Sequence, residues 1–178
     1  MKSIVLDVPH VQQPEGTTWC GATCLSMIYS YFGVQVLQEE IWKCVRAFDP
    51  LTKRPNCHTY LMVQDAQKRG FKAIGISVES QLDLLPICLA ERVIPIALWR
   101  TKANDLYGHY CVITGLDYKG IHMNDPLMQE SKGKKPCYPI KRFRLIDKGV
   151  WGSNYIQYSY IGCTIRRSNT KLVFFSRS

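Results

Sequence analysis

The sequence predicts an α+β fold, with helices in the first half of the chain and antiparallel strands in the second. Apolar residues recur at helical spacing before Gly70, and strand-like runs dominate from Phe71 onward. The length and composition agree, because 178 residues of which 46% are hydrophobic and 21% charged suffice for one packed core. We therefore expect a single domain over residues 1–178.

The first long helix is predicted over Trp19–Phe32, where the apolar residues share one helical face. A loop over His10–Thr18 precedes it. Thr17 or Thr18 is the expected N-cap, and Gly33 is the expected stop.

The remaining elements follow from the same periodicity and from turn residues. In chain order they are a strand over Ser3–Val8, helices over Leu37–Phe48 and Thr59–Arg69, a strand over Phe71–Val78, a helix over Ser80–Arg92 interrupted near Pro86, and strands over Ile94–Arg100, His109–Leu116, Gly120–Asn124, Tyr155–Arg166 and Leu172–Ser176. The basic segment Gln129–Pro136 is expected to be a flexible loop.

The formal net charge of +9 comes partly from local basic runs, which we interpret as solvated surface. No helix-turn-helix, zinc finger or base-stacking motif accompanies the charge, so no nucleic-acid partner is expected. No apolar run is long enough to cross a bilayer, and the first residues lead into a strand instead of a signal-peptide core. We expect no membrane association, and a monomer in a reducing interior.

Cys20 stands in the first turn of the first predicted helix, and this position is typical of a reactive thiol. The positive end of the helix dipole and the unsatisfied backbone N–H groups there favour a thiolate. Gly21 removes a side chain beside the sulfur, so a substrate backbone can approach it. Cys24, one turn further on, lies on the apolar face and is assigned to packing.

A nucleophilic thiol needs a base, and His109 is the best of the four histidines. It follows Gly108 at the start of an apolar strand, which gives a rigid mounting with one open side. His10, His58 and His122 are expected to be surface or structural residues.

Asn124 and Asp125, at the end of the partner strand, are both candidates to orient the imidazole. A two-residue turn of Tyr118 and Lys119 would place Asn124 on the sheet face of His109. A three-residue turn would shift the register by one and place Asp125 there. The residues leave both alternatives open.

An oxyanion hole could be formed by the backbone N–H of Cys20 and by a side-chain amide upstream, from Gln12 or Gln13. Metal sites built from Cys57 and His58, or from His109 and Cys111, lack suitable spacing. We expect no metal and no cofactor.

Three blocks of the sequence resemble the bacteriocin-leader-processing (double-glycine) cysteine peptidases and their stand-alone relatives, within the papain-like superfamily. The blocks are Val8-Pro9 with Gln12-Gln13 ahead of Trp19-Cys20-Gly21-Ala22, then Gly108-His109-Tyr110-Cys111-Val112-Ile113-Thr114-Gly115, then Asn124-Asp125-Pro126. The resemblance implies a papain-like α+β fold, with the nucleophile on the first long helix and the base and its acid on the sheet.

The resemblance also implies roles: Cys20 as nucleophile, His109 as general base and acid, Asp125 as orienting carboxylate and Gln13 as oxyanion donor. The expected activity is that of a cysteine peptidase, a thiol hydrolase that cleaves a peptide or isopeptide bond of a protein or peptide substrate. Two alternatives are acyl or peptidyl transfer through the same thioester and a non-catalytic binding module. By analogy with stand-alone effectors, we expect a cytoplasmic protein or a bacterial effector exported without a cleavable signal peptide.

Overall fold

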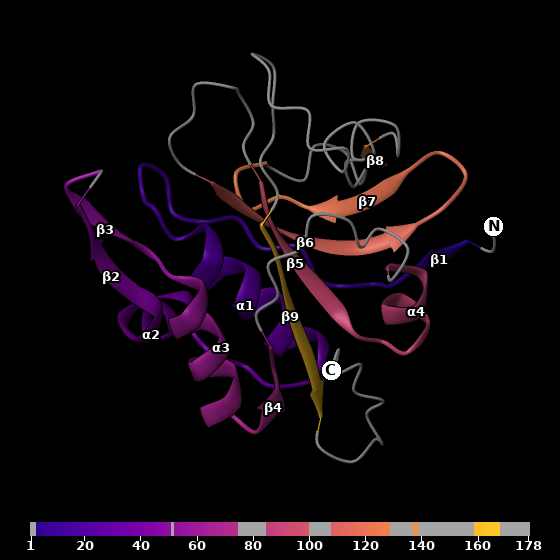
Figure 1. The fold of residues 1–178 in the computed structure, drawn as a ribbon, viewed down its shortest axis with the longest axis horizontal. Helices are drawn as coiled ribbons and strands as arrows, with labels where there is room; N and C mark the ends of the chain where they lie inside the picture. Colours follow the sequence, from indigo (N-terminus) through magenta and orange to yellow (C-terminus); the bar gives the residue numbers. More distant parts are fainter. Residues whose placement is uncertain are drawn as a thin grey trace, which may run out of the picture.

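The helices and the sheet form two layers in the computed structural model of the chain, which describes residues 3–50, 52–74, 85–99, 108–128, 137–138 and 159–167 (Figure 1). The helices are α1 (Cys20–Tyr31), α2 (Gln38–Val45), α3 (Thr59–Lys68) and α4 (Leu85–Ala90). The strands are β1 (Ile4–Val5), β2 (Arg46–Asp49), β3 (Arg54–Cys57), β4 (Phe71–Lys72), β5 (Ile94–Trp99), β6 (His109–Leu116), β7 (Ile121–Asn124), β8 (Cys137–Tyr138) and β9 (Ser159–Arg167). The predicted α+β class is confirmed.

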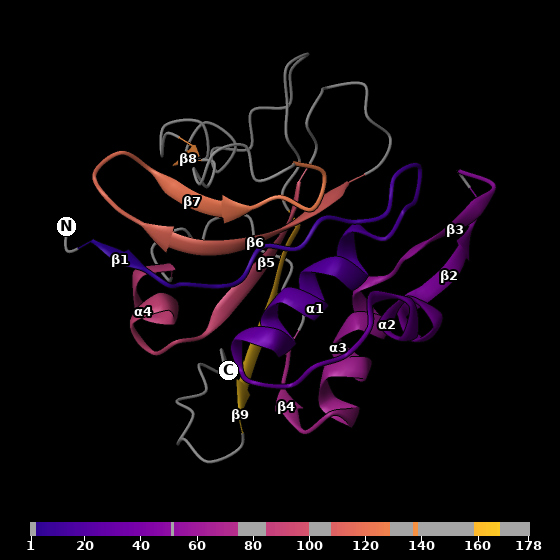
Figure 2. The ribbon, with the colours of Figure 1, turned by 180° about the vertical axis from the view of Figure 1, so that it is seen from behind.

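The main sheet is antiparallel and has the strand order β4-β9-β5-β6-β7-β8, with β1 also paired to β6. In Figure 2, α1 lies in front of the sheet, and α2 and α3 lie to the right of α1, on the side away from β7. Helix α1 contacts α2, α3 and β6, so it joins the helical part to the centre of the sheet.

Helix α1 is almost entirely enclosed: its residues 21–29 are all buried. The predicted stop is confirmed, because Gly33 adopts a left-handed φ of 78° and donates its N–H to the Ser30 carbonyl. The predicted N-cap is wrong. Trp19 occupies the cap position without a side-chain bond, while Thr17 and Thr18 donate their hydroxyls to backbone carbonyls elsewhere.

The first turn of α1 packs against Cys57, at the end of β3, whose thiol donates to the Thr18 carbonyl over 3.6 Å. Gly21 is required there, because a Cβ on it would lie 2.7 Å from the Cβ of Cys57.

The helix predicted over Leu37–Phe48 is too long, because α2 ends at Val45 and the chain turns into the β2–β3 hairpin. Arg46 is already extended, with φ −81° and ψ 140°. The cause is tertiary pairing, which overrides the helical periodicity: β2 and β3 pair over four positions, and the Asn56 amide donates to Asp49.

The second half of the chain follows the prediction where it is described. Strand β6 has the predicted bounds, and Pro86 stands in the first turn of α4, while residues 80–84 of the helix predicted over Ser80–Arg92 lie outside the described residues. The predicted strand over Leu172–Ser176, the whole segment Gln129–Pro136 and parts of the other late elements lie outside the described residues.

Strand β6 is buried on both faces, which explains its continuous apolar run. Tyr110 and Val112 belong to the core under the helices, whereas Cys111 and Ile113 belong to a second core beneath α4. Within the described parts of the chain, no helix combines the length and the apolar character that a membrane span requires.

The register between β6 and β7 changes along the hairpin. Asp117 donates its N–H to the Gly120 carbonyl, which closes the two-residue turn. A bulge between Ile113 and Gly115 then shifts the pairing, so that Val112 lies opposite Asn124. The turn thus has two residues, the alternative that would place Asn124 on the sheet face of His109. Because the bulge shifts the pairing by one residue, Asp125 lies on that face instead.

Candidate active site

Cys20 is the first residue of α1 and is partly buried. Its neighbour Trp19 stacks on Trp42 of α2, with ring centroids 5.7 Å apart, and this contact fixes the chain as it enters the helix. The thiol therefore sits at a rigid helix start, next to the positive end of the helix dipole.

His109 begins β6 and is joined to Asp125, the residue that follows β7. Its Nε2–H donates to Asp125 Oδ1 over 2.7 Å, and the side chains are only 13% and 7% exposed. The same carboxylate oxygen accepts the N–H of Leu127 over 2.9 Å. Because Asp125 occupies Nε2, Nδ1 is the ring nitrogen left to face a thiol.

The acid and the imidazole stabilise each other as an ion pair. Burial lowers the pKa of His109, but hydrogen bonds to Asp125, and to the thiols of Cys111 and Cys20, outweigh burial and raise the pKa above its ordinary value. Burial raises the pKa of Asp125, but the bond and the charge of His109 outweigh it and lower that pKa. The imidazolium form is thus favoured beside the thiol of Cys20.

Asn124 does not contact His109. It is fully buried, and its amide donates to the carbonyls of Val8, at 2.9 Å, and Pro9, at 3.3 Å. The structure therefore assigns the two candidates different positions: Asn124 holds the segment before α1, and Asp125 contacts the imidazole.

The two candidate glutamines also differ. Gln13 is buried, and its Nε2 donates to the Thr17 carbonyl over 2.8 Å, within the loop that leads to Cys20. Its backbone N–H bonds to the Pro126 carbonyl, next to Asp125. Gln12 is exposed and contributes only its carbonyl, which accepts from Gln38. Of the two glutamines, Gln13 is thus the one that bonds both to the loop before Cys20 and to the residue after Asp125.

His10, expected to be a surface or structural residue, also contacts the site. Its Nε2–H donates to the backbone carbonyl of Asp125 over 2.8 Å, and the charge of His10 helps to lower the Asp125 pKa. No periodicity or spacing in the sequence marks His10, because the contact joins residues far apart in the chain. The sequence did contain a weak indication of the position of Asp125. An isolated glycine within a strand, such as Gly115, is typical of a bulge, and a bulge shifts the register of the residues that follow it.

Two further thiols lie near Cys20, and both are kept neutral. Burial raises the pKa of Cys24 far above its ordinary value, and the neighbouring thiols and Asp125 act in the same direction. Burial, with Cys20 nearby, raises the pKa of Cys57 to about 12, although the N–H bonds from α1 oppose this. Neither is available as a thiolate near neutral pH.

A thiol at a helix start, an imidazole and a buried carboxylate, in that chain order, form the arrangement of a papain-like enzyme. The model of the Peptidase_C39-like family matches residues 5–159, which include all three. The chain belongs to the C39-like peptidase family. By family and fold it is a papain-like cysteine peptidase, and the suspected resemblance is confirmed.

Solved structures similar to this C39-like peptidase share its fold. A Bacillus anthracis protein described as a C39-like peptidase is 19% identical, over 89% of this chain and 98% of its own, with a TM-score of 0.63. The peptidase domain of Streptococcus ComA, a bi-functional ABC transporter, is 18% identical over 86% and 98%, with a TM-score of 0.58.

A double-glycine-motif protease of an AMS/PCAT transporter, solved with its leader peptide, is 19% identical to this C39-like peptidase. The match covers 90% of this chain and 99% of that one, with a TM-score of 0.55. No curated protein matches the chain in sequence.

Proposed function

We propose that this C39-like peptidase hydrolyses a peptide or isopeptide bond, with Cys20 as nucleophile, His109 as general base and acid, Asp125 as orienting carboxylate and Gln13 as oxyanion donor. The observation that carries the proposal is the bond between His109 Nε2 and Asp125 Oδ1, which leaves the second ring nitrogen for the thiol.

In the first half-reaction, the Cys20 thiolate attacks the scissile carbonyl carbon and a C–S bond forms. The oxyanion accepts hydrogen bonds from the backbone N–H of Cys20 and from the side-chain amide of Gln13. Gln13 Nε2 carries two hydrogens and donates one of them to the Thr17 carbonyl, so the other can point to the oxyanion. The C–N bond then breaks, and the His109 imidazolium gives its proton to the leaving nitrogen.

In the second half-reaction, neutral His109 takes a proton from water, and the resulting hydroxide attacks the thioester carbon. The C–S bond breaks, the acid is released, and the thiolate and imidazolium are restored. Asp125 stays ionised throughout, because its contribution is to hold the imidazole and stabilise its charge.

The selectivity of the reaction for Cys20 is supported by its neighbours. Cys24 is fully buried on the core face of α1, and Cys57 is buried at the end of β3, where its thiol donates to the Thr18 carbonyl over 3.6 Å. Both have raised pKa values, so iodoacetamide near pH 7 should modify Cys20 ahead of these two thiols.

The test is cleavage of a peptide panel by the purified full chain, read by mass spectrometry. The panel should include a sequence with two successive glycines, since one similar structure is that of a double-glycine-motif protease. Cys20→Ala and His109→Ala should abolish cleavage, and Cys44→Ala, at an exposed thiol on α2, should not. Unchanged cleavage by Cys20→Ala would refute the assignment. Unfolding of Cys20→Ala would instead assign this thiol a structural role.

Acyl transfer uses the same residues and stays a prediction, as does action as a bacterial effector. An added amine distinguishes transfer from hydrolysis, because a transferase yields the amide in place of the acid. A binding module would retain peptide without cleaving it, and trapping from lysate with Cys20→Ala would then identify a ligand that the intact chain leaves whole.

A further inference from the structure

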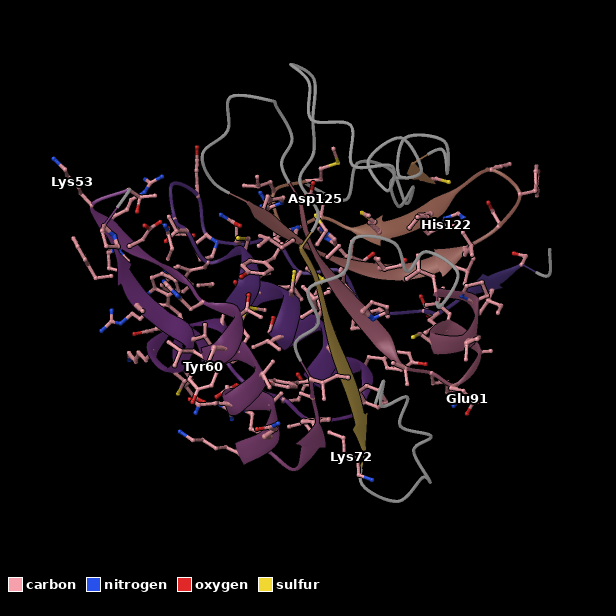
Figure 3. All side chains as sticks on the ribbon, viewed as in Figure 1. Lys53, Tyr60, Lys72, Glu91, His122 and Asp125 are labelled. Carbon is pink, nitrogen blue, oxygen red and sulfur yellow. The ribbon has the colours of Figure 1, made fainter. Side chains whose placement is uncertain are left out.

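A second cluster of aspartate, histidine and cysteine lies at the other end of the β6–β7 hairpin. His122 Nε2 lies 2.8 Å from Asp117 Oδ2 and 3.8 Å from Cys137 Sγ, and the three ligand atoms are all within 4.8 Å of one another. Figure 3 shows His122 and Asp125 at different positions along the hairpin, so this cluster is separate from the candidate active site.

The cluster has the residue types of a catalytic triad but not its geometry. A triad uses one ring nitrogen for the carboxylate and the other for the nucleophile. Here Asp117 and Cys137 both approach Nε2 of His122, so the imidazole cannot relay a proton between them. Convergence of a thiol, an imidazole and a carboxylate on one point is the geometry of a metal site.

We propose that Asp117, His122 and Cys137 bind a zinc ion, with water as the fourth ligand. Usual zinc–ligand bond lengths and tetrahedral angles place a nitrogen and an oxygen ligand about 3.3 Å apart, and a sulfur and a nitrogen about 3.6 Å apart. The observed separations are 2.8 and 3.8 Å, and the Asp117 carboxylate and Cys137 Sγ lie within 4.8 Å of each other, so the three side chains already converge on one point.

The surroundings support the ligand roles. Asp117 Oδ1 accepts the N–H groups of Lys119 and Gly120, which orients the carboxylate and leaves Oδ2 toward His122. Cys137 is exposed, so an ion and its water can reach the cluster from solvent. A thiolate and a carboxylate would together neutralise the charge of Zn²⁺.

The ion would strengthen a weak part of the sheet. Strand β8 is a two-residue strand, and Cys137 lies directly opposite His122 in its pairing with β7. Asp117 belongs to the turn between β6 and β7. A shared ion would therefore cross-link β8 to that turn, in addition to two backbone pairings.

A competing position exists at the candidate active site, where ligand atoms of His109, Cys111 and Asp125 are also within 4.8 Å of one another. Cys111 is fully buried and Asp125 nearly so, which hinders entry of a hydrated ion. The experiment must nevertheless separate the two positions.

Metal-free, reduced full-length protein should be titrated with Co²⁺, which reports thiolate ligation and four-coordinate geometry by absorption. We expect one equivalent to bind, to be displaced by Zn²⁺ and to resist excess Mg²⁺, because a thiolate and an imidazole disfavour hard cations. Cys137→Ser should remove the sulfur-to-cobalt band and weaken binding by about 100-fold or more, and His122→Ala should weaken it likewise.

Cys111→Ser and Cys20→Ala are the matched controls and should leave the Co²⁺ spectrum unchanged. The proposal is overturned if equimolar Co²⁺ at micromolar concentration does not bind. It is also overturned if the thiolate band survives in Cys137→Ser but disappears in Cys111→Ser. Cys137 is exposed, so its substitution should not impair folding and the readout does not depend on peptidase activity.

Discussion

Removal of the carboxylate from the His109–Asp125 pair should reduce turnover without unfolding the protein. The bond is 2.7 Å long, and both side chains are almost excluded from solvent. A hydrogen bond to a charged group contributes about 1.5–3 kcal/mol in such surroundings. If this is lost in the transition state, kcat/KM of Asp125→Ala should fall roughly 10- to 150-fold, since about 1.4 kcal/mol corresponds to a factor of ten. The kcat/KM of Asp125→Asn should lie between those of the wild type and Asp125→Ala, because the amide oxygen still accepts a hydrogen bond from Nε2–H of His109.

The assay is kcat/KM on any peptide that the wild-type chain cleaves, together with the rate of Cys20 alkylation, which needs no substrate. Glu39→Ala is the control: it removes a carboxylate from an ion pair of 2.8 Å with Lys43, but both side chains are about 60% exposed and the pair contributes little. Equal activity of Asp125→Ala and Glu39→Ala, in folded proteins, would refute the assignment of Asp125.

The pair should also give the unfolding free energy a characteristic pH dependence. The pKa of His109 is raised in the folded state, so its contribution is complete below the ordinary value of 6.5 and is lost as the pH rises through the folded value. The pKa of Asp125 is lowered, so its contribution is complete above 3.8 and is lost as the pH falls through the folded value. The stabilisation by the pair is therefore greatest between the ordinary pKa of Asp125, 3.8, and the ordinary pKa of His109, 6.5. Urea unfolding across pH should show a flatter profile for Asp125→Asn, and an unchanged profile would contradict the pair.

Three substitutions and one control test the surroundings of the site. Gln13→Ala should lower kcat about 10²- to 10³-fold, whereas Gln12→Ala, at the exposed neighbour, should not, and equal effects would contradict the oxyanion assignment. Gly108→Ala should cost about 1–3 kcal/mol of stability in urea unfolding, because the new Cβ would lie 2.7 Å from Leu98 Cγ. Cys24→Ser should cost about 1–3 kcal/mol through a buried hydroxyl, and a wild-type midpoint would show that this hydroxyl finds a partner.

The sequence predicted the elements that depend on local pattern. The α3 helix, the bounds of β6 and the stop at Gly33 follow from periodicity and from a glycine with left-handed φ. It failed where a distant partner decides the conformation. Thr18 does not cap α1, because its hydroxyl donates to the Pro55 carbonyl of β3, and the last predicted turn of α2 becomes β2, because it pairs with β3.

The candidate site shows the same division. Cys20 and His109 were predictable from their places at a helix start and a strand start. Asp125 could not be separated from Asn124 by the turn alone, because the bulge that sets the register lies inside β6. His10 could not be found at all, since it contacts the site through a backbone carbonyl 115 positions away in the chain.

The proposed site is built from α1, the β6–β7 hairpin and the loop before α1, and different interactions hold each of these segments in place. Helix α1 is fixed by core packing, and the β6–β7 hairpin by its ladder. The segment before α1 is joined to the end of β7 by hydrogen bonds, from His10 to the Asp125 carbonyl, from Gln13 to the Pro126 carbonyl and from the Asn124 amide to the carbonyls of Val8 and Pro9. Each such bond contributes only about 0.5–1.5 kcal/mol, so changes in this loop should alter the alignment of the oxyanion donor more than the stability of the fold. Tuning of turnover is therefore most accessible in the loop, and tuning of stability in α1 and β6.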